Sequence, residues 1–193
     1  MYTKNPFTIE DPQKIREFIR AHPFATIISP NLEITHAPLI HEKEDYLIGH
    51  LAKANSHHKL IEGRAKIIFH GPHHYISPKW YVVTNKVPTW NYCVLHCEAE
   101  ISLNRDDDFL NSMLEKLTHF NEAKSRDPWI FRAEESLIKN QLRGIIGIEV
   151  KILKYEMKWK LGQHQPKKDH QSMIENLEAV GGGELADYLK NKY

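Results

Sequence analysis

The chain has 193 residues, of which 41% are hydrophobic and 26% charged, and its formal net charge at pH 7 is +1. This composition is typical of a globular protein with a buried core and excludes an intrinsically disordered chain. The small net charge excludes a global field that would steer the protein to DNA or to an anionic membrane. No run of about 18 apolar residues is present, and the start of the chain lacks the apolar segment of a secretory signal, so we expect a cytoplasmic protein.

The first predicted element is a helix that begins at Asp11 and Pro12. Asp11 suits the N-cap position and Pro12 the first helical position. Short β-like runs follow the helix, at residues 24–29, 33–39, 46–51 and 66–70. Between the last two, residues 57–63 predict a short helix that is closed by Gly63.

Residues 71–92 are rich in proline and aromatic residues, which predicts an ordered loop with one strand near residues 80–84. Residues 93–101 then alternate between apolar and polar, which is typical of a half-buried strand. Cys93 and Cys97 would lie about 13 Å apart on one face of it. A disulfide needs Cα atoms within roughly 7 Å, so we expect two buried free thiols.

In the last half of the chain, Asn104 is the predicted N-cap of a helix whose first turn is acidic. The pattern then predicts a helix near 134–142, a strand at 146–152, a helix from Asp169 and a short C-terminal helix. This order has no regular βαβ rhythm. We therefore predict a mainly β (α+β) fold, an antiparallel barrel with peripheral helices. One domain would cover residues 1–193, with a helical C-terminal segment at about 165–193.

Two kinds of segment suggest a ligand site. In GHLAKANSHHK (residues 49–59), Lys53, Asn55 and Lys59 cluster beside a predicted helix start, which suits a phosphate group. The alternative is a solvated loop that only turns the chain.

Aromatic residues gather in FHGPHHYISPKWY (residues 69–81) and VPTWNY (residues 87–92). Tyr75 and Trp80 can wall a flat conjugated ligand, or they can pack against the barrel. Trp90 offers a stacking surface and Asn91 both donates and accepts hydrogen bonds. The alternative for Trp90 is a plug in a dimer interface, and in a barrel that binds its ligand between subunits both interpretations hold.

Thirteen histidines raise the question of a metal site. The neighbours His73 and His74 point apart in an extended chain, and no CxxC or HExxH spacing is present. We therefore predict no dedicated metal site, while haem contact through a single histidine stays open. Signatures of covalent catalysis, of a P-loop and of a helix-turn-helix are also absent from the sequence.

Taken together, these segments resemble the PaiB-like family of FMN-binding negative transcriptional regulators. The blocks that carry the resemblance are THAPL, GHLAKANSHHK, FHGPHHYISPKWY, VPTWNYCVLHCEAE and the closing KWKLGQHQPKKDHQSMIENL. The chain departs from the family at residues 162–164, where Gly-Gln-His replaces Ser-Gln-Asn. It also departs after Asn55, where the family often has a proline and an aromatic residue.

The resemblance implies a split β-barrel, shared with pyridoxamine-phosphate oxidases and flavin reductases, in which a homodimer forms the FMN site. Lys53, Asn55 and Lys59 would surround the FMN phosphate. The isoalloxazine ring would contact a second set of residues, partly from the other subunit: Trp90 and Asn91, with Tyr75 or Trp80.

Three functions follow from this resemblance. The first is a flavin-dependent sensor or negative transcriptional regulator that binds DNA or a regulatory protein. The second is a flavin-dependent oxidoreductase, for which the flavin supplies its own redox chemistry. The third is a haem-handling protein. The near-zero net charge argues against simple operator binding, and no catalytic residue is predicted.

Overall fold

A computed structural model describes residues 1–2 and 7–191 of the chain. The chain forms two compact units. Unit 1 consists of Met1–Ile15, His70–Leu95 and Glu156–Tyr193, and unit 2 of Arg16–Phe69 and His96–Tyr155. Three long strands contribute residues to both units, and the single domain expected from the sequence stays a prediction. Among the described residues, no helix is long and apolar enough to cross a membrane.

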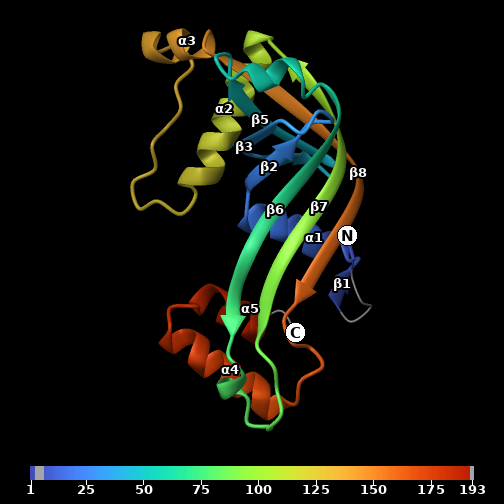
Figure 1. The fold of residues 1–193 in the computed structure, drawn as a ribbon. Helices are drawn as coiled ribbons and strands as arrows, with labels where there is room; N and C mark the ends of the chain where they lie inside the picture. The colour runs from blue at the N-terminus through green and yellow to red at the C-terminus, as the bar shows by residue number, and fades with distance from the viewer. Residues whose placement is uncertain (3–6, 192–193) are drawn as a thin grey trace. The chain divides into compact units, whose positions relative to one another are not determined.

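Within the described residues, eight strands form one sheet (Figure 1). Seven of them have the order β3-β2-β6-β7-β8-β5-β4, and the eighth, β1, pairs with β8. Its strands are β1 (Thr8–Ile9), β2 (Phe24–Ile28), β3 (Ile34–Pro38), β4 (Ile40–Lys43), β5 (Tyr46–Ala52), β6 (Gly63–Ile76), β7 (Thr89–Asn104) and β8 (Ile145–Lys160). Antiparallel pairing joins β2 to β3 and β6, β8 to β1 and β5, and β4 to β5. The predicted mainly β, antiparallel architecture is therefore confirmed.

The helices are α1 (Pro12–Ala21), the short 3-10 helices η2 (Ser56–Lys59) and η3 (Pro78–Trp80), α2 (Asp107–Glu122), α3 (Ser136–Leu142), α4 (Lys167–Ala179) and α5 (Gly183–Asn191). The start of α1 is as predicted, because a side-chain oxygen of Asp11 accepts a hydrogen bond of 2.9 Å from the Gln13 backbone. The start of α2 differs. Its N-cap is Asp106, which accepts from the Phe109 backbone, while Asn104 accepts from the Asp106 backbone one step earlier.

Three other predictions are corrected by the structure. Residues 71–92 are not mainly loop, since β6 continues to Ile76 and β7 begins at Thr89. No strand forms at 80–84, where η3 ends and a bend follows. The helix expected at 57–63 is only the single turn of η2, because Gly63, with φ at +90°, already begins β6.

The core of unit 2 lies between α2 and strands β4 and β5. Its buried members are Ile40, Ile48, Leu110, Met113, Leu117 and Leu142. In unit 1, α4 and α5 supply buried residues, and the Trp159 ring meets the Tyr188 ring edge-on with centroids 5.6 Å apart. Each unit therefore has apolar packing of its own.

Strand β7 alternates as the sequence predicts, with Cys93, Leu95, Cys97, Ala99 and Ile101 all buried. Both cysteines are free thiols. Burial raises the pKa of each thiol, that of Cys97 to about 12. The two thiols are therefore protonated and unreactive near neutral pH.

Candidate functional site

Unit 1 contains a cavity of about 410 Å³. Its apolar wall is formed by Phe7, Tyr81 and Val87, and its polar wall by Lys86, Thr89, Asn91, Lys160, His164 and Gln165, with Gly162 between them. These residues come from the position before β1, from the loop that precedes β7, from the first residues of β7, and from the end of β8 and the loop that follows it. Two ammonium groups and no carboxylate are among the described residues that line the cavity, and the charge of Lys86 is balanced by Asp169 outside the lining.

Lys160 is held by neutral acceptors. Its ammonium donates to the hydroxyl oxygen of Thr89 at 2.5 Å and to the carbonyl oxygen of Trp90 at 2.8 Å. Among residues 1–2 and 7–191, no carboxylate forms an ion pair with it. An ammonium has three hydrogens to donate, so one remains after these two contacts.

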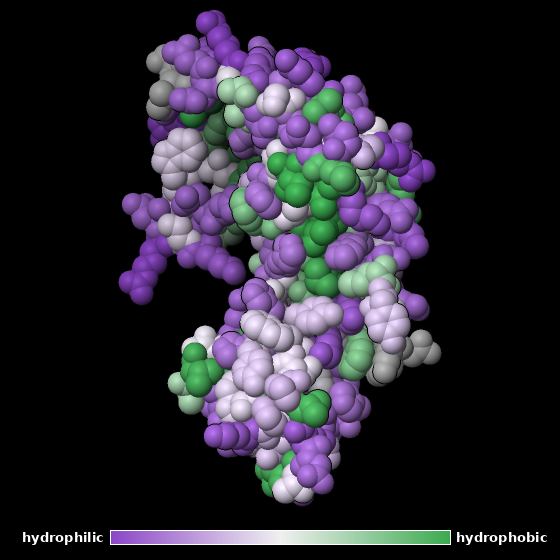
Figure 2. All heavy atoms as spheres, in the orientation of Figure 1, coloured by the Kyte–Doolittle hydropathy of each residue, from purple (hydrophilic) through white to green (hydrophobic). Residues whose placement is uncertain are grey.

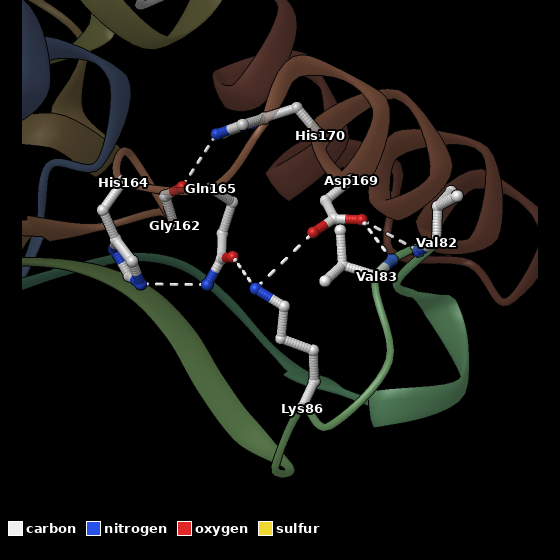
Figure 3. A network of polar contacts seen from close by, with 8 residues as sticks. All are labelled: Val82, Val83, Lys86, Gly162, His164, Gln165, Asp169 and His170. Carbon is white, nitrogen blue, oxygen red and sulfur yellow. Dashed lines mark hydrogen bonds and ion pairs between the residues drawn. The ribbon is translucent and has the colours of Figure 1, made fainter.

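Lys86 begins a chain of hydrogen bonds along the cavity wall (Figure 3). Its ammonium donates to Gln165 Oε1 at 2.6 Å, and Gln165 Nε2 lies 2.9 Å from His164 Nε2. Because an amide nitrogen only donates, His164 Nε2 must accept, and its imidazole carries its proton on Nδ1. The ring of His164 also meets Phe7 edge-on at 6.0 Å between centroids.

Asp169 holds the loop that forms this wall of the cavity. It is fully buried in α4 and accepts hydrogen bonds from the backbone of Val82 at 2.8 Å and of Val83 at 3.1 Å, and its other oxygen lies 3.6 Å from Lys86 Nζ (Figure 3). Burial alone would raise the pKa of this carboxyl, but the two backbone N–H groups and Lys86 outweigh it and lower the pKa. Asp169 was predicted to start the helix before the C-terminal one, but that helix, α4, begins at Lys167 after Pro166.

Asn91 is 2% exposed and lines the cavity, and its Nδ2 makes no hydrogen bond within the described residues. Gly162 lies beside it. A Cβ on Gly162 would be 3.7 Å from Asn91 Nδ2, and φ at +79° suits glycine there. A buried, unpaired donor is costly in a folded protein. A bound ligand with an acceptor atom would give the Asn91 amide its missing hydrogen bond.

Trp90 lies on the opposite face of β7 and is 53% exposed. It is grouped with two side chains of β6: Tyr75, edge-on at 6.4 Å between centroids, and His73 at 6.2 Å. Pale side chains gather on the surface over this end of the two strands (Figure 2). Trp80 is not part of the group, since its ring contacts His74 at 5.9 Å. The structure thus brings Trp90 and Tyr75 together and separates them from Asn91 and Trp80.

The predicted phosphate residues lie in unit 2. Lys53 follows β5 and Lys59 is the last residue of η2, not its first; both side chains are exposed, and neither makes an ion pair within the described part of the chain. Asn55 has structural partners, since its Oδ1 accepts from the His57 backbone and its Nδ2 donates to Thr35 Oγ1, each at 3.0 Å. Asn55 therefore shapes the turn between the two lysines and keeps one free N–H.

His57 explains how the chain departs from the family after Asn55. The ring is buried and its Nε2 lies 2.8 Å from Ser29 Oγ, which itself donates to Asn31 at 2.5 Å. His57 must therefore donate from Nε2, which leaves Nδ1 as a buried acceptor without a hydrogen bond in the described residues. Burial lowers the pKa of His57, against a smaller opposite effect of Glu33. The ring is thus a neutral part of the core.

Sequence reasoning missed Lys86 and Lys160. Both were within reach of it, because Lys86 directly precedes VPTWNY and Lys160 lies in the closing block KWKLGQHQ. As for metal ligands, the described ranges hold no group of three or more His, Cys, Asp or Glu side chains placed to bind an ion.

The sheet order and the flanking helices define the split-barrel class of flavin-binding folds. Two solved structures show this likeness: the flavocytochrome Anf3 from Azotobacter vinelandii, with a TM-score of 0.65, 11% identity and coverage of 88% of this chain and 78% of that one, and the FAD and heme binding protein from Mycobacterium smegmatis, with a TM-score of 0.64, 12% identity and coverage of 86% and 79%. At these identities the likeness concerns the fold alone, and it confirms the predicted split barrel.

The chain belongs to the PaiB-like family of FMN-binding domains. The family model described as "Putative FMN-binding domain" matches residues 1–154. "Protease synthase and sporulation protein PAI 2" of Bacillus subtilis (strain 168) is 27% identical over 203 residues, which cover 100% of this chain and 98% of that protein. "Uncharacterized protein AN0679" of Emericella nidulans is also 27% identical, with 86% of each chain covered. The resemblance seen in the sequence motifs is thereby confirmed.

Proposed function

We propose that this protein binds FMN and acts as a flavin-dependent sensor and negative regulator of transcription of the PaiB type. The observation that carries the proposal is the exposed Trp90 beside Tyr75 at the start of β7. A large aromatic surface left open to solvent is typical of a ligand or partner site. Membership of an FMN-binding family makes a flavin the natural ligand.

In the proposed complex the isoalloxazine lies against Trp90 and Tyr75. Offset or edge contacts between aromatic rings contribute about 0.5–1.5 kcal/mol beyond burial. The sequence prediction also assigns ring contacts to Asn91 and Trp80. Because these face away from the Trp90 side, the proposal leaves them out of the ring contact.

The phosphate of FMN would be bound by Lys53 and Lys59, with the free N–H of Asn55 between them. Two exposed ammonium groups that have no carboxylate partner in the described part of the chain suit a dianion, since no such ion pair has to be broken. A bound flavin supplies reversible electron transfer, and these residues hold and orient it.

A homodimer is part of the proposal, with phosphate and ring residues supplied by different subunits. Support comes from exposed apolar side chains on β2 and β3, Phe24 at 64% and Ile34 at 56% exposure. Figure 2 shows apolar atoms on the surface of that region. Because β3 is the last strand in the sheet order, no strand of the described residues pairs with its outer edge, and a second copy can cover it.

For the regulatory role, a protein partner fits better than direct binding to an operator. The formal net charge is only +1, whereas operator binding depends on many phosphate contacts from lysine and arginine.

The test is to purify the protein, record its absorption spectrum and titrate the apoprotein with FMN while its mass is followed by light scattering. We expect a yellow protein with a flavin spectrum, saturable binding of one FMN per chain, and a dimer. A Soret band instead of a flavin spectrum would replace the proposal with haem handling. Colourless protein that does not bind added FMN would refute it.

A further inference from the structure

The cavity of unit 1 has features that the flavin proposal does not use. Among residues 1–2 and 7–191, Lys160 donates only to the neutral oxygens of Thr89 and Trp90, which leaves one of its N–H groups. Charges withdrawn from water in proteins are normally paired with an opposite charge. A half-buried ammonium that faces a cavity without a carboxylate therefore favours an anionic ligand.

A second feature points into the same space. Asn91 Nδ2 is buried and unpaired within residues 1–2 and 7–191, and its residue lines the cavity. Leaving a buried donor without an acceptor costs the free energy of its desolvation. A ligand that carries an acceptor beside its negative charge would satisfy Asn91 and Lys160 together.

The size and apolar wall of the cavity limit the ligand further. A volume of about 410 Å³ lies in the range of roughly 300–1,000 Å³ for small-molecule pockets. At about 30 Å³ for each molecule of liquid water, it has room for about a dozen heavy atoms. Phe7, Tyr81 and Val87 would pack against a carbon skeleton, so the ligand is organic rather than a bare inorganic ion.

We propose that this cavity binds a compact organic carboxylate, with the carboxylate at Lys160 and Asn91 and the carbon skeleton against Phe7, Tyr81 and Val87. The site is separate from the lysines proposed for the FMN phosphate, and its occupation does not depend on flavin. The protein would thus bind a second ligand besides FMN, a small organic acid.

The experiment is calorimetric titration of the full chain with benzoate, with and without saturating FMN, using benzamide as the neutral isostere and inorganic phosphate as a second anion. We expect one benzoate per chain and binding of benzamide and phosphate at least about tenfold weaker. Benzoate affinity should be the same with FMN bound.

Two variants test the residues. Lys160→Met should weaken benzoate at least about tenfold, whereas Lys168→Met, which removes the same charge from an exposed position of α4, should leave it unchanged. Because Lys160 also donates to the Trp90 carbonyl, its loss could disturb the local fold, so Asn91→Leu serves as a second variant. This change removes the donor at similar volume, and it should weaken benzoate binding several-fold in a folded protein.

Three outcomes would overturn the proposal: no saturable benzoate binding, equal binding of benzamide, or unchanged affinity in both variants. Displacement of benzoate by FMN would also overturn it, because the cavity would then belong to the flavin site. Failure of the flavin proposal looks different, since FMN would not bind while the benzoate results stayed as they are.

Discussion

The ammonium of Lys86 lies 3.6 Å from the carboxylate of Asp169, an acid with no exposed surface in α4. The same carboxylate accepts the two backbone N–H groups of Val82 and Val83. One buried side chain thus fixes the path of the loop that forms one wall of the cavity.

Replacing this acid should loosen the loop. Asp169→Asn removes the charge, and because both backbone N–H groups donate to one oxygen, both would then face a weaker amide acceptor or an NH₂ group. The midpoint of urea denaturation should therefore fall at pH 7. The exposed Asp187→Asn in α5 is the matched control and should behave like the wild type. Since the pKa of Asp169 is lowered in the folded state, its contribution is present above the unfolded value of about 3.9 and is lost as pH falls below it. The variant should therefore lose part of the acid sensitivity below about pH 4.

Lys59→Glu tests the phosphate site. Reversing the charge next to a dianion should weaken FMN about tenfold or more, while riboflavin, which has no phosphate, should be little affected. Titration of both ligands by fluorescence measures the difference. Lys124→Glu, at another exposed position of unit 2, controls for the change in net charge. Equal losses of affinity for FMN and riboflavin would show that Lys59 does not contact the phosphate.

Trp90→Ala separates a ring contact from an interface plug. A ring contact predicts flavin binding weaker by about tenfold, since stacking and burial are lost together, while the dimer persists in light scattering. Trp129→Ala removes a tryptophan of nearly equal exposure, 52% against 53%, and should bind FMN normally. Dissociation of the Trp90→Ala dimer before any loss of FMN would favour the plug. Normal binding in an intact dimer would remove Trp90 from the site.

His57 should make the protein less stable in mild acid. Its pKa is lowered in the folded state by burial, so the unfolded chain binds the proton first. The stabilising contribution is full above about pH 6.5 and is lost as pH falls from there through the folded pKa. Urea denaturation at about pH 7.5 and pH 5.5 should therefore show a smaller pH dependence for His57→Gln, which keeps a donor for Ser29. The exposed His70→Gln should keep the dependence of the wild type.

Elements with a local signal were predicted well. The cap at Asp11 and the alternation of β7 depend on neighbours in the sequence, and both are confirmed. The predicted N-cap of α2, Asn104, was wrong by two residues. Asn104 and Asp106 are both good N-cap residues, and only the folded turn decides between them.

The extension of β6 needed information that the sequence alone does not hold. Gly71 and Pro72 predict a break, yet both lie within the strand. Proline cannot donate to a sheet, but the register of β6 with β2 ends at Phe69, so on that side Pro72 interrupts no pairing. The tertiary fold decides at which residue a strand loses its hydrogen-bonded neighbour, so the local sequence does not show it.

The candidate site shows the same division. The motifs predicted that Trp90 and Asn91 are important, but they cannot show that the two face opposite sides of β7. Lys86 and Lys160 meet at one cavity from distant parts of the chain, and a single sequence gives no signal for such a meeting. The partners of Asp169 were hidden for the same reason.

The protonated thiols of Cys93 and Cys97 have a practical consequence. Maleimides and spin-label reagents attack the thiolate, and these two side chains are buried and hold their protons. A cysteine introduced on the surface can therefore be labelled selectively in the otherwise natural chain. Fluorescence or electron-spin distance measurements on this protein need no prior removal of its own cysteines.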